Sequence, residues 1–138
     1  MCLYPDAAYT AKLAERIEKT THRKILAWKV VDCYPDGSLR SHYYNETRWD
    51  AGWQRSTSRR RWTGRLRRAR HAINRGIHVY LSRHRASLLA RRFGTSTRVL
   101  PVWCHLDDLI AAEVGWDEAV FRKVYATEHA IAKAKRPA

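Results

Sequence analysis

Histidine and cysteine are the side chains of this 138-residue chain best suited to catalysis. Among seven histidines, His78 stands out because it lies in a short apolar run after Gly76 and beside an arginine-rich segment. A histidine acts as a general base when a partner orients it, but within a strand it more often has a structural role. Cys2 would become an N-terminal nucleophile if Met1 were removed, yet the sequence supplies no other part of such a site. His78 is therefore the one catalytic candidate.

The cysteines form neither a metal pattern nor a disulfide pattern. Cys2, Cys33 and Cys104 are odd in number and include no CxxC pair, which favours reduced thiols in a reducing compartment. Structural zinc needs paired ligands at short spacing, so we predict no metal, and without a glycine-rich phosphate loop we predict no cofactor. No run reaches roughly 18 apolar residues and no signal-peptide pattern opens the chain. We expect no membrane contact and a cytoplasmic location.

Arginine gives the strongest functional signal. Between Ala51 and His105 the chain has fourteen arginines and no Asp, Glu or Lys, whereas the rest balances thirteen basic against thirteen acidic residues. The formal net charge of +14 therefore comes from one segment. Guanidinium groups grip phosphate through two parallel hydrogen bonds and stack on bases, and a field of one sign attracts polyanions. A GC-rich genome would favour Arg over Lys but would not remove the carboxylates.

We therefore predict a phosphate-contacting nucleic-acid site in the arginine-rich segment 55–75. Trp49 and Trp53, just before this segment, either stack on bases or fold back over the edge of the core, and Trp62 is a further candidate for stacking. The partner would be DNA or RNA, or a host nucleic-acid-binding complex, and an acidic protein surface is a further alternative. The oligomeric state stays open. The predicted site comprises Arg55, Arg59, Arg60, Arg61, Arg65, Arg67, Arg68, Arg70, Arg75, Trp53 and Trp62.

One domain over residues 1–138 must position this site, since the chain is too short for two cores. In its first half, the apolar spacing predicts a helix over 7–20 capped by Asp6 and a central strand over 25–33. A turn at 34–38 leads to an antiparallel return strand over 39–44. The polar stretch 45–58 is predicted to be a loop.

The second half begins with a predicted basic helix over 60–75, or alternatively an arginine-rich loop that orders only on binding. A strand over 77–81, a helix from Ser82 to Phe93 closed by Gly94, and a strand over 99–105 follow. Pro101 indicates an edge strand or a bulge.

The chain ends with a predicted short helix over 107–113 and a final helix over 117–133, although 119–126 also satisfies strand alternation. The predicted class is α+β, a small single domain with a central, mostly antiparallel sheet flanked by helices.

The run Ile77-His78-Val79-Tyr80-Leu81-Ser82 and the helix and strand after it resemble a stretch of the RNA 2′-phosphotransferases, members of the ADP-ribosyltransferase-like fold. Their His-x-His-Leu-Ser strand is matched at His78, Leu81 and Ser82, but Tyr80 replaces the second histidine. The matched stretch covers about a fifth of the chain. The resemblance implies an alternative function, an enzyme acting on NAD or an RNA phosphate with His78 in its pocket.

The overall layout also resembles small phage or prophage proteins that open with Met-Cys-Leu and have no assigned chemistry. That resemblance implies an accessory protein of a mobile element, an inhibitor that blocks a host defence complex. The matching segments are Met1-Cys2-Leu3, Lys29-Val30, Ser41-His42-Tyr43-Tyr44 and Gly76-Ile77-His78.

Overall fold

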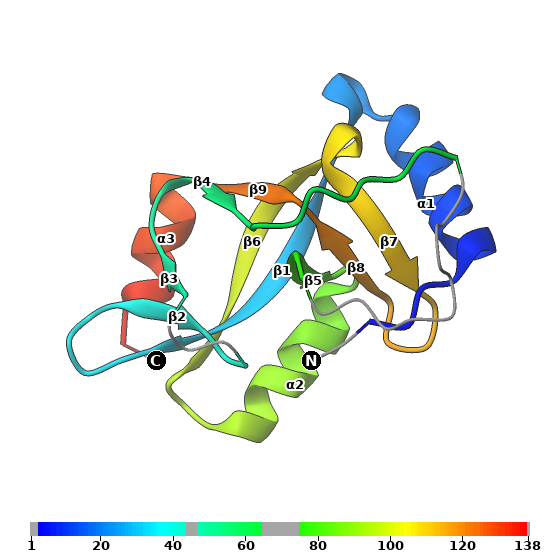
Figure 1. The fold of residues 1–138 in the computed structure, drawn as a ribbon. Coiled ribbons are helices and arrows are strands. Elements are labelled where there is room, and N and C mark those ends of the chain that lie inside the picture. Colours follow the sequence, from blue (N-terminus) through cyan, green and yellow to red (C-terminus); the bar gives the residue numbers. More distant parts are fainter. Residues whose placement is uncertain (1–2, 44–46, 65–74, 138) are drawn as a thin grey trace.

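The computed structural model describes residues 3–43, 47–64 and 75–137. There the chain forms a large antiparallel sheet with strand order β4-β9-β6-β1-β5-β8-β7, and β2 and β3 extend from one end of β1 (Figure 1). The predicted α+β class is confirmed. The strands are β1 (Lys24–Cys33), β2 (Leu39–Ser41), β3 (Arg48–Trp49), β4 (Gly52–Arg55), β5 (Ile77–Tyr80), β6 (Thr97–His105), β7 (Leu109–Glu113), β8 (Glu118–Phe121) and β9 (Lys123–Ala126). The helices are α1 (Ala7–Glu18), α2 (Arg83–Phe93) and α3 (Glu128–Lys135), with 3-10 turns η1 (Thr21–Arg23) and η2 (Leu106–Asp108).

The longest pairing joins β1 to β6 and confirms the predicted central strand. Its register runs without interruption from Lys24 opposite His105 to Asp32 opposite Thr97. Pro101 does not mark an edge, because β6 lies between β1 and β9. The pairing of β6 with β9 is confined to Trp103 opposite Tyr125. No described residue of β9 therefore pairs with Pro101, whose backbone has no N–H to donate.

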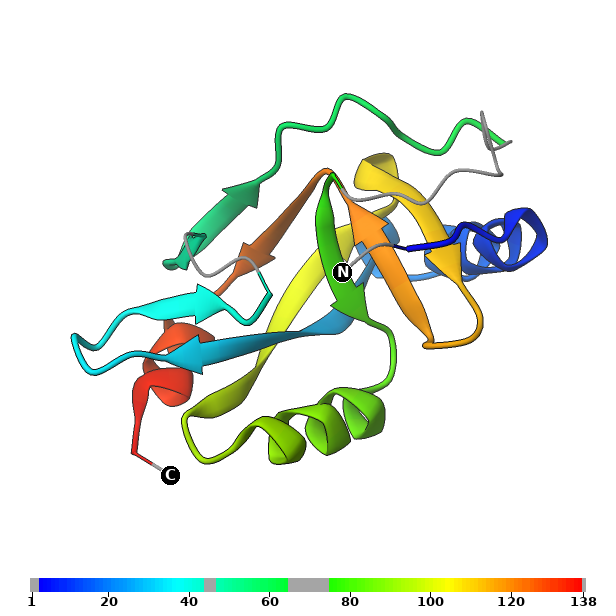
Figure 2. The same cartoon turned by 60° about the horizontal axis from the view of Figure 1, so that its bottom comes forward.

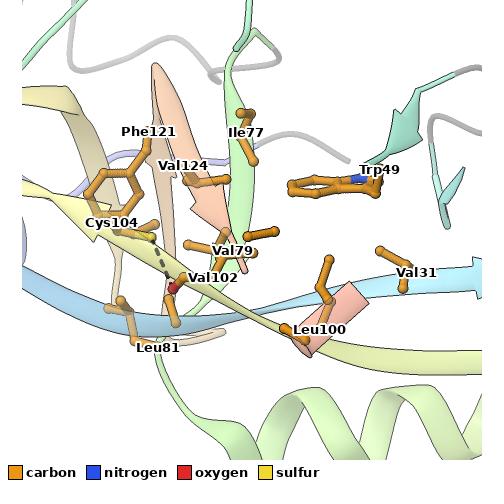
Figure 3. Close-up of a cluster of buried hydrophobic side chains, with 14 of the residues drawn as sticks. Val31, Trp49, Ile77, Val79, Leu81, Leu100, Val102, Cys104, Phe121 and Val124 are labelled. Carbon is orange, nitrogen blue, oxygen red and sulfur yellow. Dashed lines mark hydrogen bonds between the residues drawn. The ribbon is translucent and has the colours of Figure 1, made fainter. Parts of the chain in front are cut away.

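The curved sheet has an inner and an outer face, because successive side chains of a strand alternate between them (Figure 2). The inner face holds the main core, which α1 and α3 complete through Leu13, Ile17 and Ile131. On the outer face, α2 packs Ala86 and Ala90 against a smaller cluster on β1, β5 and β6. Figure 3 shows inner-face side chains of the main core, among them Val31, Trp49, Ile77, Val79, Leu81, Leu100, Val102, Cys104, Phe121 and Val124.

Local capping signals predicted two of the helices well. Asp6 accepts a hydrogen bond from Tyr9 N at 2.8 Å to begin α1, and Ser82 accepts one from Arg85 N to begin α2. Gly94 ends α2 at a positive φ of 110°. Phe93, the last residue of α2, is exposed with its ring against His42. No helix in the described ranges is long and apolar enough to cross a membrane.

The predicted loop over 45–58 is wrong in its described part, which contains β3 and β4. Trp49 pairs with Leu39 on β2, and its ring is buried, with Nε1 donating to Ser41 Oγ at 2.7 Å. β4 pairs with β9, about seventy residues later in the chain. Strands this short have too few residues to show a periodic pattern in the sequence. Pairing with distant strands stabilises them instead.

The two C-terminal helices predicted over 107–113 and 117–133 are wrong over most of their length. Residues 109–113, 118–121 and 123–126 form the strands β7, β8 and β9, and the strand alternation over 119–126 was the correct alternative. Only the end of the second predicted helix is confirmed, in α3. Every residue of β8 is buried, so its apolar residues recur at spacings that a helix would also show. The final helix is α3 alone, which begins at Glu128 with Thr127 accepting from Ala130 N at 3.1 Å.

Candidate nucleic-acid interface

After β4 the chain continues as an extended segment, residues 56–64, which we call the strap (Figures 1 and 2). Ser56 N and Oγ both donate to Arg122 O at 2.8 Å, and Trp62 N donates to Leu109 O. These bonds fix the strap along the edge of the sheet beside η2. The helix predicted over 60–75 is therefore wrong for 60–64, because Trp62 N bonds to β7 rather than to a carbonyl of its own turn. Residues 65–74 lie outside the described residues.

Three consecutive arginines of the strap, Arg59, Arg60 and Arg61, are exposed, and so is Arg55 at the end of β4. None of them forms an ion pair with a described carboxylate. Trp62 is partly buried against the main core. Arg75 is exposed just before β5. Arg65, Arg67, Arg68 and Arg70 lie outside the described residues.

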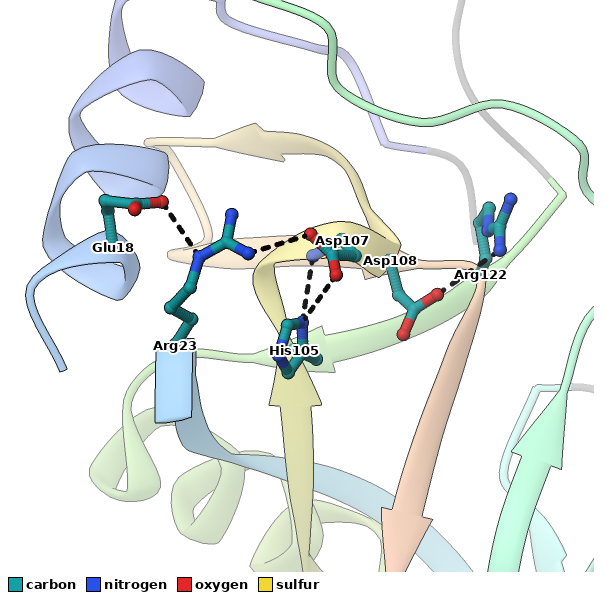
Figure 4. Close-up of polar contacts among 6 residues, drawn as sticks. All are labelled: Glu18, Arg23, His105, Asp107, Asp108 and Arg122. Atoms are coloured by element: carbon teal, nitrogen blue, oxygen red, sulfur yellow. Dashed lines mark hydrogen bonds and ion pairs between the residues drawn. The ribbon is translucent and has the colours of Figure 1, made fainter. Parts of the chain in front are cut away.

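Carboxylates near η2 are instead paired with arginines from outside residues 51–105 (Figure 4). Arg23 bonds to Glu18 at 3.1 Å and to Asp107 at 3.3 Å, and Arg122 lies 3.4 Å from Asp108. These acids are therefore partly neutralised already. The positive charge of the strap has no equivalent compensation in the described structure.

The fourteen arginines do not form one surface, although they come from one segment. The strap and α2 lie on opposite sides of the sheet in both views (Figures 1 and 2). Arg85 donates to Gly115 O at 2.8 Å and Arg98 to the carbonyl oxygens of Thr97 and Arg136, so these two have structural roles. The other exposed arginines of α2 are Arg83, Arg91 and Arg92.

A row of apolar side chains crosses the outer face of four adjacent strands. Cross-strand pairing places Trp53 opposite Tyr125, Tyr125 opposite Trp103, and Trp103 opposite Leu26. Trp53 and Tyr125 meet edge to face, with ring centres 5.2 Å apart. Trp53 is 53 % exposed, Leu26 37 % and Tyr125 36 %, whereas Trp103 is only partly exposed. This uncovered row is uncommon for side chains of that size.

A second row lies two residues further along the same strands and consists of basic side chains. Lys24 is opposite His105, and Arg55 is opposite Lys123. The Lys24 ammonium lies 4.8 Å from the centre of the Trp103 ring, and the Lys123 ammonium lies 4.6 Å from that of Trp53. Such cation–π contacts hold the cations beside the rings. We call the two rows together the outer strip.

Of the outer strip, Arg55 and Trp53 on β4 were predicted from the sequence, whereas the residues on β1, β6 and β9 were not. The missing signal is the cross-strand register, which joins residues 24–26, 53–55, 103–105 and 123–125. Each of these stretches contains a basic residue and an apolar residue two positions apart. That pattern is visible in the sequence, but the pairing of the strands is not.

The catalytic candidate His78 lies on β5 among buried residues and is itself only 6 % exposed. Its backbone carbonyl accepts from Lys29 Nζ at 2.8 Å. Burial lowers the pKa of Lys29 to about 8, which the attraction of Glu118 partly offsets. Burial, reinforced by Glu113, raises the pKa of Glu118 to about 7. The NAD- or RNA-directed activity implied by the resemblance stays a prediction, and the described residues contain no cluster suited to a metal.

Compared with known protein families, with curated proteins and with solved structures, the chain matches none.

Proposed function

We propose that the protein binds nucleic acid, with Arg55 and the strap arginines Arg59, Arg60 and Arg61 contacting phosphates. The observation that carries this proposal is their exposure without carboxylate partners in the described structure. Repulsion among neighbouring cations disfavours the folded state, and surfaces without a polyanionic ligand normally mix both signs. A phosphate backbone would relieve this repulsion.

The anchoring of the strap supports the same proposal. Ser56 and Trp62 hold its two ends through bonds to Arg122 O and Leu109 O. Arginines on a fixed backbone lose less conformational freedom on binding than arginines on a free loop. The accessory role in a host that the phage-like layout implies stays a prediction.

Binding should show a steep salt dependence that the strap supplies. We would measure the fluorescence anisotropy of a labelled 12-nucleotide oligonucleotide over a salt series. Each phosphate contact contributes about 0.7 to the slope of log K against log salt on a single strand. A triple variant with Arg59→Gln, Arg60→Gln and Arg61→Gln should therefore lose about 2 from this slope.

A matched control removes the same number of charges from α2, which lies on the opposite side of the sheet from the strap. The triple variant Arg83→Gln, Arg91→Gln and Arg92→Gln alters only exposed positions of α2. It should keep the wild-type slope. Absence of wild-type binding at low salt would refute the proposal. If only the α2 variant had a smaller slope of log K against log salt, the phosphate contacts would lie on α2 and not on the strap.

A further inference from the structure

We infer that the outer strip is a stacking platform for single-stranded nucleic acid, on which two or three bases lie over Trp53, Tyr125 and Trp103. This inference rests on the proposed function and adds the strandedness of the ligand and the surface that holds its bases. Aromatic rings on an open sheet are a recurring way to hold unpaired bases, since every base has a π-face.

The spacing of the rings fits a short single strand. The three rings come from the adjacent strands β4, β9 and β6, in direct register. Neighbouring strands lie about 4.8 Å apart, so the first and third positions are separated by about 10 Å. A single strand need not stack its bases on one another, so two or three bases can each lie over one ring across this distance.

The basic row supplies the complementary charge. It runs parallel to the ring row and is offset by two residues along each strand, about 7 Å. Bases on the rings would therefore place their phosphates over Lys24, Lys123 and Arg55. One acid lies close to the end of this row, because Asp107 is 3.5 Å from His105, but Arg23 pairs with the same carboxylate.

The uncovered state of the strip contrasts with the rest of the outer face. Where Val30 and Tyr80 occupy that face, α2 packs on them through Ala86 and Ala90. The strip presents side chains of similar size, yet Trp53, one of its two tryptophans, stays half exposed. Its apolar surface is thus available to a ligand.

The charges of the strip also decide what kind of ligand fits. A second copy of this chain docked through the same surface would bring two basic rows, each with Lys24, Lys123 and Arg55, close to one another, which is repulsive. Duplex DNA stacks its bases on one another and offers only their edges in its grooves, so flat rings on a sheet gain little from it. A single strand offers both ring faces and phosphates.

The test compares ring variants on single-stranded and duplex probes. Labelled dT12, rU12 and a 12-base-pair duplex would be titrated with wild type, Trp53→Ala and Tyr125→Ala. Each variant should lose roughly 5- to 150-fold in affinity for a single strand, the usual effect of removing one stacked ring, while its salt slope stays unchanged. The dT12 and rU12 arms show whether DNA or RNA is preferred.

Two further variants serve as controls. Trp116→Ala removes a ring of equal exposure, 54 %, from the turn between β7 and β8, and should bind within about twofold of wild type. Trp53→Phe retains a ring and should recover most of the affinity. It also shows that loss in Trp53→Ala reflects the ring rather than the fold.

The outcomes separate the inference from the function on which it rests. Wild-type affinity in Trp53→Ala and Tyr125→Ala, together with weak binding by the strap triple variant, would overturn the platform and leave nucleic-acid binding intact. Equal loss on the duplex would also overturn it. Failure of the wild type to bind any probe would remove both proposals.

Discussion

Glu118 allows a quantitative test of the structure because its carboxyl is buried in the sheet with little compensation. The residue is 1 % exposed, and its Oε1 has no hydrogen-bond partner in the described structure. Burial, reinforced by the Glu113 carboxylate, raises its pKa to about 7 from an ordinary value of 4.5. The folded protein therefore keeps this proton over a pH range in which the unfolded chain has already released it.

The sign of the effect on stability follows from that difference. The stabilisation from the protonated carboxyl is complete below pH 4.5 and is lost as the pH rises through 7. At about 1.4 kcal/mol for each pH unit between the two pKa values, the free energy of unfolding should fall by about 3 kcal/mol. Lys29 acts in the opposite direction above pH 8, because burial lowers its pKa from 10.5 to about 8. Its contribution to stability should rise between pH 8 and 10.5.

The assay is urea unfolding, followed by tryptophan fluorescence, at pH steps from 4.5 to 7.5. The seven histidines also titrate in this range, so wild type must be compared with Glu118→Gln, in which their contributions cancel. The stability of the variant relative to wild type should increase by about 3 kcal/mol across the series. A difference that stays constant with pH would contradict this prediction, since it would mean that the Glu118 carboxyl ionises alike in the folded and unfolded states.

Two further predictions concern the packing that holds the strands together. Trp49→Ala should lower the free energy of unfolding by about 3 to 5 kcal/mol in urea, because it empties a buried volume and leaves Ser41 Oγ without its donor; a loss below about 1 kcal/mol would contradict the burial of that ring. Gly76→Ala should lower the urea midpoint, with a loss of about 2 kcal/mol or more, because its Cβ would lie 2.4 Å from Val120 Cγ1 at a φ of 113°. An unchanged midpoint would show that this backbone conformation is not required.

Elements with local signals were predictable from the sequence. Asp6 and Ser82 mark the beginnings of α1 and α2, and Gly94 marks the end of α2. The central strand β1 was also predictable, because apolar residues occupy both of its faces along its ten residues. In each case the information lies within the element, in a cap or in its own pattern of burial.

Elements defined by distant partners were not predictable. The spacing of apolar residues from Trp62 onward predicted a helix over 60–75, but within the strap the backbone of Trp62 bonds to Leu109 instead. The C-terminal strands failed for a related reason, since Val120, Phe121 and Val124 repeat with a spacing that suits a helix as well as a buried strand. The local sequence favoured helix and extended conformations about equally, and hydrogen bonds to distant residues decided between them.

In the candidate site, too, features with a local signal were predictable and features that depend on strand pairing were not. Composition alone located the cations, because missing carboxylates are countable, but it treated residues 51–105 as one surface, and the fold separates the strap from α2. Lys24 and Tyr125 lie outside that segment, where basic and acidic residues balance, so no count of charge could include them. The sheet brings them to Arg55 and Trp53 because two-residue alternation on each strand keeps cation and ring on the same face. A one-residue slip of β9 would turn Lys123 and Tyr125 inward and bury a charge, so packing of the core and alignment of the outer strip depend on the same register.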